Sequence, residues 1–122
     1  MTSRRQELGR RGEQMAARAV AAAGATILAR NWRCAAGEID ILARDGDTLV
    51  VVEVRTRWGT AYGTPEESLT APKQAKLVEL GQAYVQEIDW GGPWRIDLVA
   101  VQFNSAGGLE RLEVIRDAVE GR

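Results

Sequence analysis

The chain has 122 residues, the length of a single domain. It has no histidine and one cysteine, which excludes Ser-His-Asp and Cys-His catalysis and an internal disulfide, and disfavours a zinc site. Sixteen Lys and Arg against seventeen Asp and Glu give a net charge of −1, which argues against non-specific coating of DNA.

Helices and strands are predicted in the order αβββαββ. Ser3 is expected to cap a helix that runs to about Ala23 and stops at Gly24. Hydrophobic patterning then predicts three strands, a helix that opens at Thr70 and Pro72 and ends before Gly91, and two further strands. The predicted strands are Ala25–Trp32, Glu38–Arg44, Thr48–Arg57, Trp94–Phe103 and Leu109–Ile115.

The helix between the third and fourth strands predicts a crossover that makes those two strands parallel. The fold class is therefore α/β, with a mixed central sheet flanked by helices. Each helix has one face expected to pack on the sheet. The first face is Leu8, Gly12, Met15, Ala16, Ala19 and Ala23, and the second is Leu77, Leu80, Tyr84 and Ile88.

We expect one domain over residues 1–122, with flexible ends at residues 1–8 and 116–122. No stretch approaches eighteen consecutive apolar residues, and the N-terminus has no apolar run of the signal-peptide type. These features predict a cytoplasmic protein with no membrane segment.

The second and third strands are predicted to form a hairpin through a two-residue turn, Gly46-Asp47. Residues whose numbers sum to 93 then face each other. One face pairs Asp40 with Glu53, Glu38 with Arg55 and Leu42 with Val51. The other face pairs Ile39 with Val54 and Ile41 with Val52, and is wholly apolar. A one-residue slip would mix the two faces, so the pattern favours this register.

Two opposed carboxylates on neighbouring strands repel each other unless something compensates their charge. A divalent cation does so, because hard oxygen ligands suit Mg²⁺, and Arg55 would then lie close enough to stabilise a phosphate. Asp40, Glu53 and Arg55 thus fit metal-assisted phosphodiester hydrolysis. The alternative is a set of plain ion pairs, Glu38 with Arg55 and Asp40 with Arg30, Arg33 or Arg57.

The basic residues are concentrated in the first half of the chain. Residues 1–60 hold ten arginines against seven acidic residues, whereas residues 61–122 hold six basic residues against ten acidic ones. Arginine matches phosphate geometry, so the first half is compatible with nucleic acid, although a solvated face explains it as well. Any of Trp32, Trp58, Trp90 and Trp94 could stack on a base, with core packing as the alternative.

The motifs together resemble the YraN family of small bacterial proteins, over about residues 9–103. The matching residues are Gly9 to Glu13 (G-x-x-G-E), Ala16, Arg30-Asn31, Gly37 to Asp40 (GEID), Val52 to Arg55 (VEVR), Gly63, Lys73 and Arg95-x-Asp97. The resemblance implies the PD-(D/E)xK nuclease-like, or restriction-endonuclease-like, fold and a similarity to archaeal Holliday-junction resolvases.

The resemblance also implies roles by position. Asp40, Glu53 and the Val54 carbonyl would bind Mg²⁺ or Mn²⁺, and Glu13 would support the metal from the first helix. Arg55 stands where the fold usually has a lysine, and an arginine effectively cannot lose its proton to activate water. Lys73 is a possible substitute cation. Arg30, Arg33, Arg57 and Lys73 are the expected contacts to nucleic acid.

The resulting hypothesis is a Mg²⁺-dependent endonuclease that acts on structured or branched DNA and works as a homodimer by analogy with junction enzymes. One alternative is a catalytically weak nuclease-fold module that binds nucleic acid or a DNA-repair partner. Another is an adaptor whose carboxylates only form ion pairs.

Overall fold

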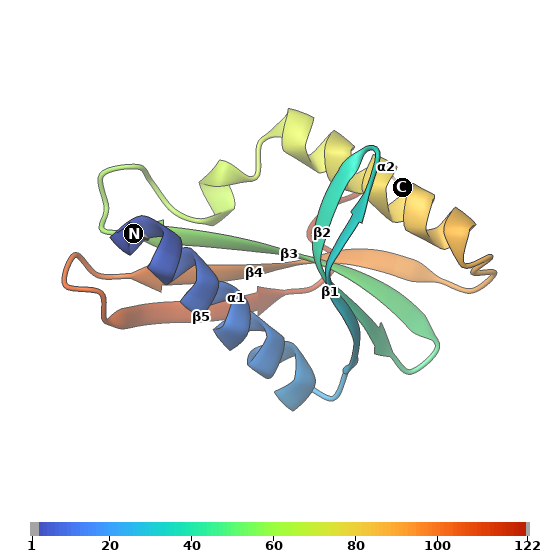
Figure 1. Cartoon of the computed structure of the whole chain (residues 1–122), viewed down its shortest axis with the longest axis horizontal. Coiled ribbons are helices and arrows are strands. Elements are labelled where there is room, and N and C mark those ends of the chain that lie inside the picture. The colour runs from blue at the N-terminus through green and yellow to red at the C-terminus, as the bar shows by residue number, and fades with distance from the viewer. Residues whose placement is uncertain (1–2, 122) are drawn as a thin grey trace.

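The structure, a computed structural model, describes residues 3–121. One sheet holds five strands in chain order, and two helices and a short 3-10 helix, η1, complete the fold (Figure 1). The helices and strands are α1 (Arg4–Ala22), β1 (Thr26–Cys34), β2 (Gly37–Asp45), β3 (Thr48–Trp58), η1 (Glu66–Ser68), α2 (Ala71–Glu87), β4 (Trp94–Phe103) and β5 (Leu109–Ile115). The predicted order αβββαββ and the mixed α/β fold class are confirmed.

Strands β3 and β4 are parallel and every other neighbouring pair is antiparallel, as the crossover through α2 requires. The hairpin turn is confirmed too. Asp45 pairs with Thr48, and Gly46 has a φ of +59°, a value that suits glycine at the first position of such a turn. The register predicted for Leu42 with Val51 is also observed.

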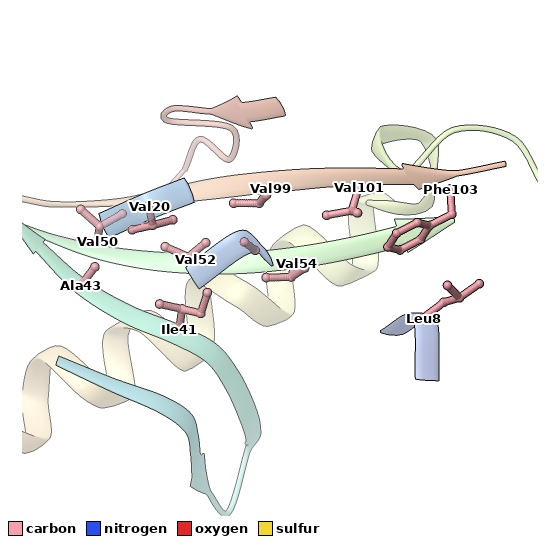
Figure 2. Close-up of a cluster of buried hydrophobic side chains, with 11 residues drawn as sticks. Leu8, Val20, Ile41, Ala43, Val50, Val52, Val54, Val99, Val101 and Phe103 are labelled. Carbon is pink, nitrogen blue, oxygen red and sulfur yellow. The ribbon is translucent and has the colours of Figure 1, made fainter. Parts of the chain in front are cut away.

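Helix α1 covers one face of the sheet. Ser3 caps it with a reciprocal capping box, accepting a hydrogen bond from the Gln6 backbone N–H while the Gln6 side chain accepts one from the Ser3 N–H. Figure 2 shows the buried side chains of β2, β3 and β4 together with Leu8 and Val20 of this helix. The residues labelled there are Leu8, Val20, Ile41, Ala43, Val50, Val52, Val54, Val99, Val101 and Phe103, all buried.

Helix α2 covers the opposite face, through Leu77 and Leu80. These two side chains belong to a second buried cluster that contains Ile39, Leu42 and Val51. Leu42 and Val51, which the predicted register places on the same face as the carboxylates, are fully buried beneath α2. Both faces of the central strands are covered, as the parallel pairing with β4 favours.

The prediction that Ile39 and Ile41 lie on the same face of β2 is wrong. Ile41 packs with the α1 cluster, whereas Ile39 packs with the α2 cluster, so β2 changes face at Asp40. Strand β1 is irregular alongside, with a register shift between Ile27 and Ala29. In Figure 1 the far end of the β1–β2 hairpin curls toward α2.

Each helix departs from its predicted face near its end. Val20, and not Ala23, is the last buried residue of α1. On α2, Ile88 is 41% exposed, and the buried position missed by the pattern is Gly81, where a Cβ would run into the Trp94 ring. Beyond β5, Val119 is 1% exposed and packs in the α2 cluster.

Over residues 3–121, neither helix combines the length and the hydropathy needed to cross a membrane.

Candidate metal centre and phosphate site

The candidate site lies where β2 and β3 separate. The last residues paired between the two strands are Ile41 and Val52. Beyond this pair, the backbone N–H of Val54, two residues past Val52, donates a hydrogen bond of 2.8 Å to Oδ2 of Asp40, the residue before Ile41. The Asp40 carboxylate therefore takes the place of a backbone hydrogen bond between β2 and β3. This bond fixes the carboxylate at Val54, the residue next to Glu53.

Glu53 contacts the Asp40 carboxylate, as the register predicts. Burial and the neighbouring Asp40 raise the pKa of Glu53 to about 8, and the guanidinium of Arg55 offsets this only in part. At neutral pH the pair therefore holds a proton between two carboxyl groups. A cation placed between them would displace that proton, because it stabilises both ionised forms.

Arg55 is held in place by two partners. Its Nη1 lies 3.5 Å from Oε2 of Glu53, and its Nε donates a hydrogen bond of 2.8 Å to Oγ of Ser68 in η1. The alternative ion pair between Arg55 and Glu38 is not observed, and Glu38 pairs with Arg33, at 3.6 Å. Arg55 thus stands beside the carboxylate pair with its position fixed by the crossover segment.

Segment η1, which supplies Ser68, is itself tied to the sheet. Arg111 on β5 donates hydrogen bonds to both carboxylate oxygens of Glu66, at 2.7 and 3.0 Å, and this pairing lowers the pKa of Glu66. Sequence reasoning missed both Ser68 and this ion pair. A three-residue 3-10 helix has no periodicity to reveal it.

Glu13 approaches the site from α1. Burial first, and then the charge of Asp40, raises the pKa of Glu13, whereas Arg30 lowers it. Asn31, a residue that sequence reasoning gave no role, lies between Glu13 and Glu38. In the amide orientation that satisfies both, its NH₂ group donates to Glu13 at 3.3 Å and to Glu38 at 3.2 Å.

The backbone of Asn31 explains its position. Its φ is +53°, a left-handed conformation that asparagine tolerates better than most residues. The pairs on either side, Arg30 with Ile41 and Trp32 with Ile39, place Asn31 opposite Asp40. An asparagine in the middle of an otherwise strand-forming run was the signal available in the sequence.

These groups surround an open cleft of about 350 Å³. It is lined by Gly9, Glu13, Glu38, Asp40, Val54, Arg55, Thr56 and Arg57. Glu53 is not part of the lining, but it contacts two residues that are, Asp40 and Arg55. The structure thus brings Glu13, Asp40, Val54, Arg55 and Arg57 together, and the cleft is lined by both carboxylates and arginines.

The other predicted nucleic-acid contacts lie outside the cleft lining. Arg30 is exposed on β1 and close enough to influence Glu13. Arg33 is exposed at the end of β1, and Lys73 is exposed in the first turn of α2. Lys73 is therefore poorly placed to substitute for the lysine that Arg55 replaces.

No group of three or more Asp, Glu, Cys or His side chains capable of holding a metal occurs within residues 3–121. Asp40 and Glu53, which contact each other, offer a smaller set of carboxylate donors. Mg²⁺ is commonly held by one or two carboxylates, several waters and substrate phosphate oxygens, so a pair of carboxylates with a shared proton fits this ion. Asp40 has no ion-pair partner within 4.0 Å among the described residues, contrary to the plain ion-pair interpretation.

Comparison with known proteins identifies close relatives of similar length. The family model described as "Uncharacterised protein family UPF0102" matches residues 12–101. A UPF0102 protein of Roseiflexus castenholzii is 48% identical over 122 residues, which cover 98% of each chain. A UPF0102 protein of Clavibacter michiganensis subsp. michiganensis is 44% identical over 117 residues, covering 95% of this chain and 98% of the relative.

Proposed function

This chain belongs to the UPF0102 family, and we propose that it is a Mg²⁺- or Mn²⁺-dependent endonuclease that hydrolyses phosphodiesters in structured or branched DNA. One observation carries the proposal. Asp40 and Glu53 are brought into contact where two strands separate, and Arg55 is held beside them at the edge of an open cleft.

Each residue has a distinct part in this proposal. Asp40, Glu53 and the Val54 carbonyl hold the cation, which when bound would stabilise charge on the phosphate and lower the pKa of a coordinated water. Glu13 supports that shell from α1. Arg55 contacts a non-bridging oxygen of the scissile phosphate and stabilises the charge that develops there. Arg57 contacts a phosphate on the same strand of DNA.

Arg55 also supports a second candidate, a nuclease-fold module that binds nucleic acid or a repair partner and cuts weakly. Its guanidinium is engaged by Glu53 and Ser68 and cannot act as a base near neutral pH. Activation of water then depends on the metal alone. Binding of branched DNA without cutting, unchanged in Glu53→Gln, would favour this candidate.

The deciding experiment is cleavage of a labelled four-way junction with Mg²⁺ or Mn²⁺, alongside calorimetric titration of the metal. We expect cutting by the wild type and its loss in Asp40→Asn and Glu53→Gln. The matched control is Glu110→Gln, an exposed carboxylate on β5, which should cut normally. Absence of metal binding in the wild type would refute the proposal.

Symmetrical cutting of a branched substrate requires two active sites. We therefore propose that the protein acts as a homodimer. Light scattering of the protein alone and bound to a junction measures its mass directly. A monomer in both states would refute this part and leave the chemistry untouched.

A further inference from the structure

A second pocket adjoins the metal-site cleft, and the function proposed above gives it no role. It has a volume of about 350 Å³ and lies between the first turns of α1 and the end of β3. Its lining is Arg5, Leu8, Gly9, Thr56, Arg57, Trp58 and Tyr62. Gly9, Thr56 and Arg57 line both the pocket and the cleft, so a strand of DNA bound in one can continue into the other.

Among residues 3–121, no carboxylate forms an ion pair with the arginines of this pocket. Arg57 Nε is buried and has no hydrogen-bond partner within the part of the chain that the structure describes. Neither Arg5 nor Arg57 forms an ion pair with any described carboxylate. Burial, followed by the charges of Arg55 and Arg5, lowers the pKa of Arg57. An anionic ligand would satisfy the buried donor and relieve the repulsion among the three arginines.

The other wall is aromatic. Tyr62 is 80% exposed and Trp58 is 39% exposed, so both rings are accessible to a ligand. The Trp58 ring is held by a hydrogen bond of 3.0 Å from its Nε1 to the Ser105 carbonyl and by the Arg4 guanidinium, 5.5 Å from its centroid. Trp58 is therefore a fixed ring, whereas Tyr62 lies on the segment between β3 and η1.

Aromatic rings beside arginines that form no ion pair are side chains suited to recognise a nucleotide. Bases stack on aromatic rings regardless of sequence, and arginine binds the attached phosphate. A paired base is already stacked in its duplex, so the ligand that gains from such a wall is an unpaired one. The pocket volume lies at the lower end of the range for ligand sites, which suits a single nucleotide.

We propose that this pocket binds one unpaired nucleotide of the DNA substrate, with its base against Trp58 and Tyr62 and its phosphate on Arg57 and Arg5. The proposal rests on the nuclease function and narrows its substrate class to DNA with a single-stranded segment next to the cut, such as a flap or an open junction arm. The bound DNA strand then passes from the pocket over Arg57 into the metal-site cleft.

The test measures binding without metal, so it does not depend on cleavage. Fluorescence anisotropy in EDTA compares a labelled ten-residue oligothymidylate with a ten-base-pair blunt duplex, and free dTMP serves as competitor. We expect at least a tenfold preference for the single strand. Tyr62→Ala should weaken its binding about tenfold, in line with the loss of one stacked base, and Tyr62→Phe should remain within about twofold of wild type.

Arg57→Gln should weaken single-strand binding and reduce the slope of log K against log salt concentration by about 0.7, the value for one phosphate contact. Arg18→Gln, which removes an exposed arginine from α1, is the matched control and should leave both unchanged. Tyr62 is too exposed for its replacement to unfold the domain, so a null effect of Tyr62→Ala would overturn the proposal.

The outcomes separate this inference from the nuclease proposal. Equal binding of duplex and single strand, or failure of excess dTMP to displace the oligonucleotide, overturns the pocket assignment even when Asp40→Asn abolishes cleavage. Conversely, single-strand binding that is lost in Tyr62→Ala supports the pocket even when no metal-dependent cutting is found. Asp40→Asn should retain single-strand binding in EDTA.

Discussion

The Val54 backbone N–H donates a hydrogen bond of 2.8 Å to the Asp40 carboxylate, on the neighbouring strand. Backbone pairing between β2 and β3 ends at Ile41 and Val52, so this side chain bridges the opening between the strands. Fixed there, Asp40 meets Glu53, which retains a proton up to a pH of about 8. Two of our predictions follow from this proton.

Metal binding should release a proton. At pH 7 most Glu53 is protonated, because its pKa is about 8, and Mg²⁺ or Mn²⁺ requires the carboxylate. Titration calorimetry in two buffers of different ionisation enthalpy should therefore show close to one proton released per ion at pH 7 and almost none at pH 9.5. Glu53→Gln should bind metal more weakly with no such release. Equal heats in both buffers at pH 7 would contradict the assignment.

The same proton makes stability depend on pH. The folded state binds it more tightly than the unfolded state, whose Glu53 titrates near 4.5, so this contribution is complete below pH 4.5 and is lost as the pH rises through about 8. The free energy of unfolding should fall by up to about 1.4 kcal/mol per pH unit in that window. Urea unfolding at pH 5 to 8.5 measures it. The wild type should lose stability relative to Glu53→Gln as pH rises, and parallel curves would disprove the raised pKa.

Arg55→Lys should increase cleavage. A lysine at this partly buried position can lose its proton and accept one from water, which the arginine cannot. General-base assistance commonly contributes about 10²- to 10⁴-fold, so we expect a gain of at least about tenfold in single-turnover cutting of a labelled junction with Mn²⁺. Arg44→Lys, a remote arginine stacked on Trp90, is the control. Slower cleavage by Arg55→Lys would show that the contacts of Arg55 with both Glu53 and Ser68 contribute more to the rate than a general base would.

Asp97→Ala should be strongly destabilising. Asp97 is 4% exposed and accepts hydrogen bonds from Nε and Nη2 of Arg95, at 2.9 and 3.2 Å, and from the Asp117 N–H, at 2.9 Å. Its removal leaves the partly buried Arg95 with Asp45 as its remaining acidic partner. Breaking such a pair costs about 3–5 kcal/mol, measurable by urea unfolding. Asp47→Ala, in the exposed hairpin turn, should cost under about 0.5 kcal/mol, and similar values for both would refute the argument.

Alanine should have opposite effects at two helical glycines. At Gly81 a Cβ would overlap the Trp94 ring edge, so Gly81→Ala forces α2 away from the sheet and should cost about 1–3 kcal/mol. At Gly9 of α1 nothing lies within 4 Å of such a Cβ, so Gly9→Ala should stabilise the protein by about 0.5–1 kcal/mol through helix propensity. Thermal unfolding of both variants checks this, and a shift of the same sign in both would contradict it.

The hairpin that presents the carboxylates was predictable because its information is local. A Gly-first turn and two runs of apolar residues fix the register, and the pairs Leu42–Val51 and Ile41–Val52 are observed as expected. The two last strands match their predicted bounds because Gly-Gly turns flank them. The family was predictable as well, because the motifs that resemble YraN proteins, which form the UPF0102 family, are spread over nearly the whole chain.

The parts that could not be predicted depend on contacts between distant segments. Ile39 changes face because its strand bends toward α2, which no alternation rule describes. Ser68 reaches Arg55 only through a segment without periodic structure, which Arg111 holds from β5. The role of Asn31 depends on a left-handed backbone at one residue.

The two-residue turn at Gly46 and Asp47 lies at the far end of β2 from Asp40, yet it determines which side chain meets Glu53. One residue inserted in the turn would shift β2 by roughly 3.3 Å and turn Asp40 to the opposite face. Among natural variants, changes in the length of this short turn should therefore be excluded.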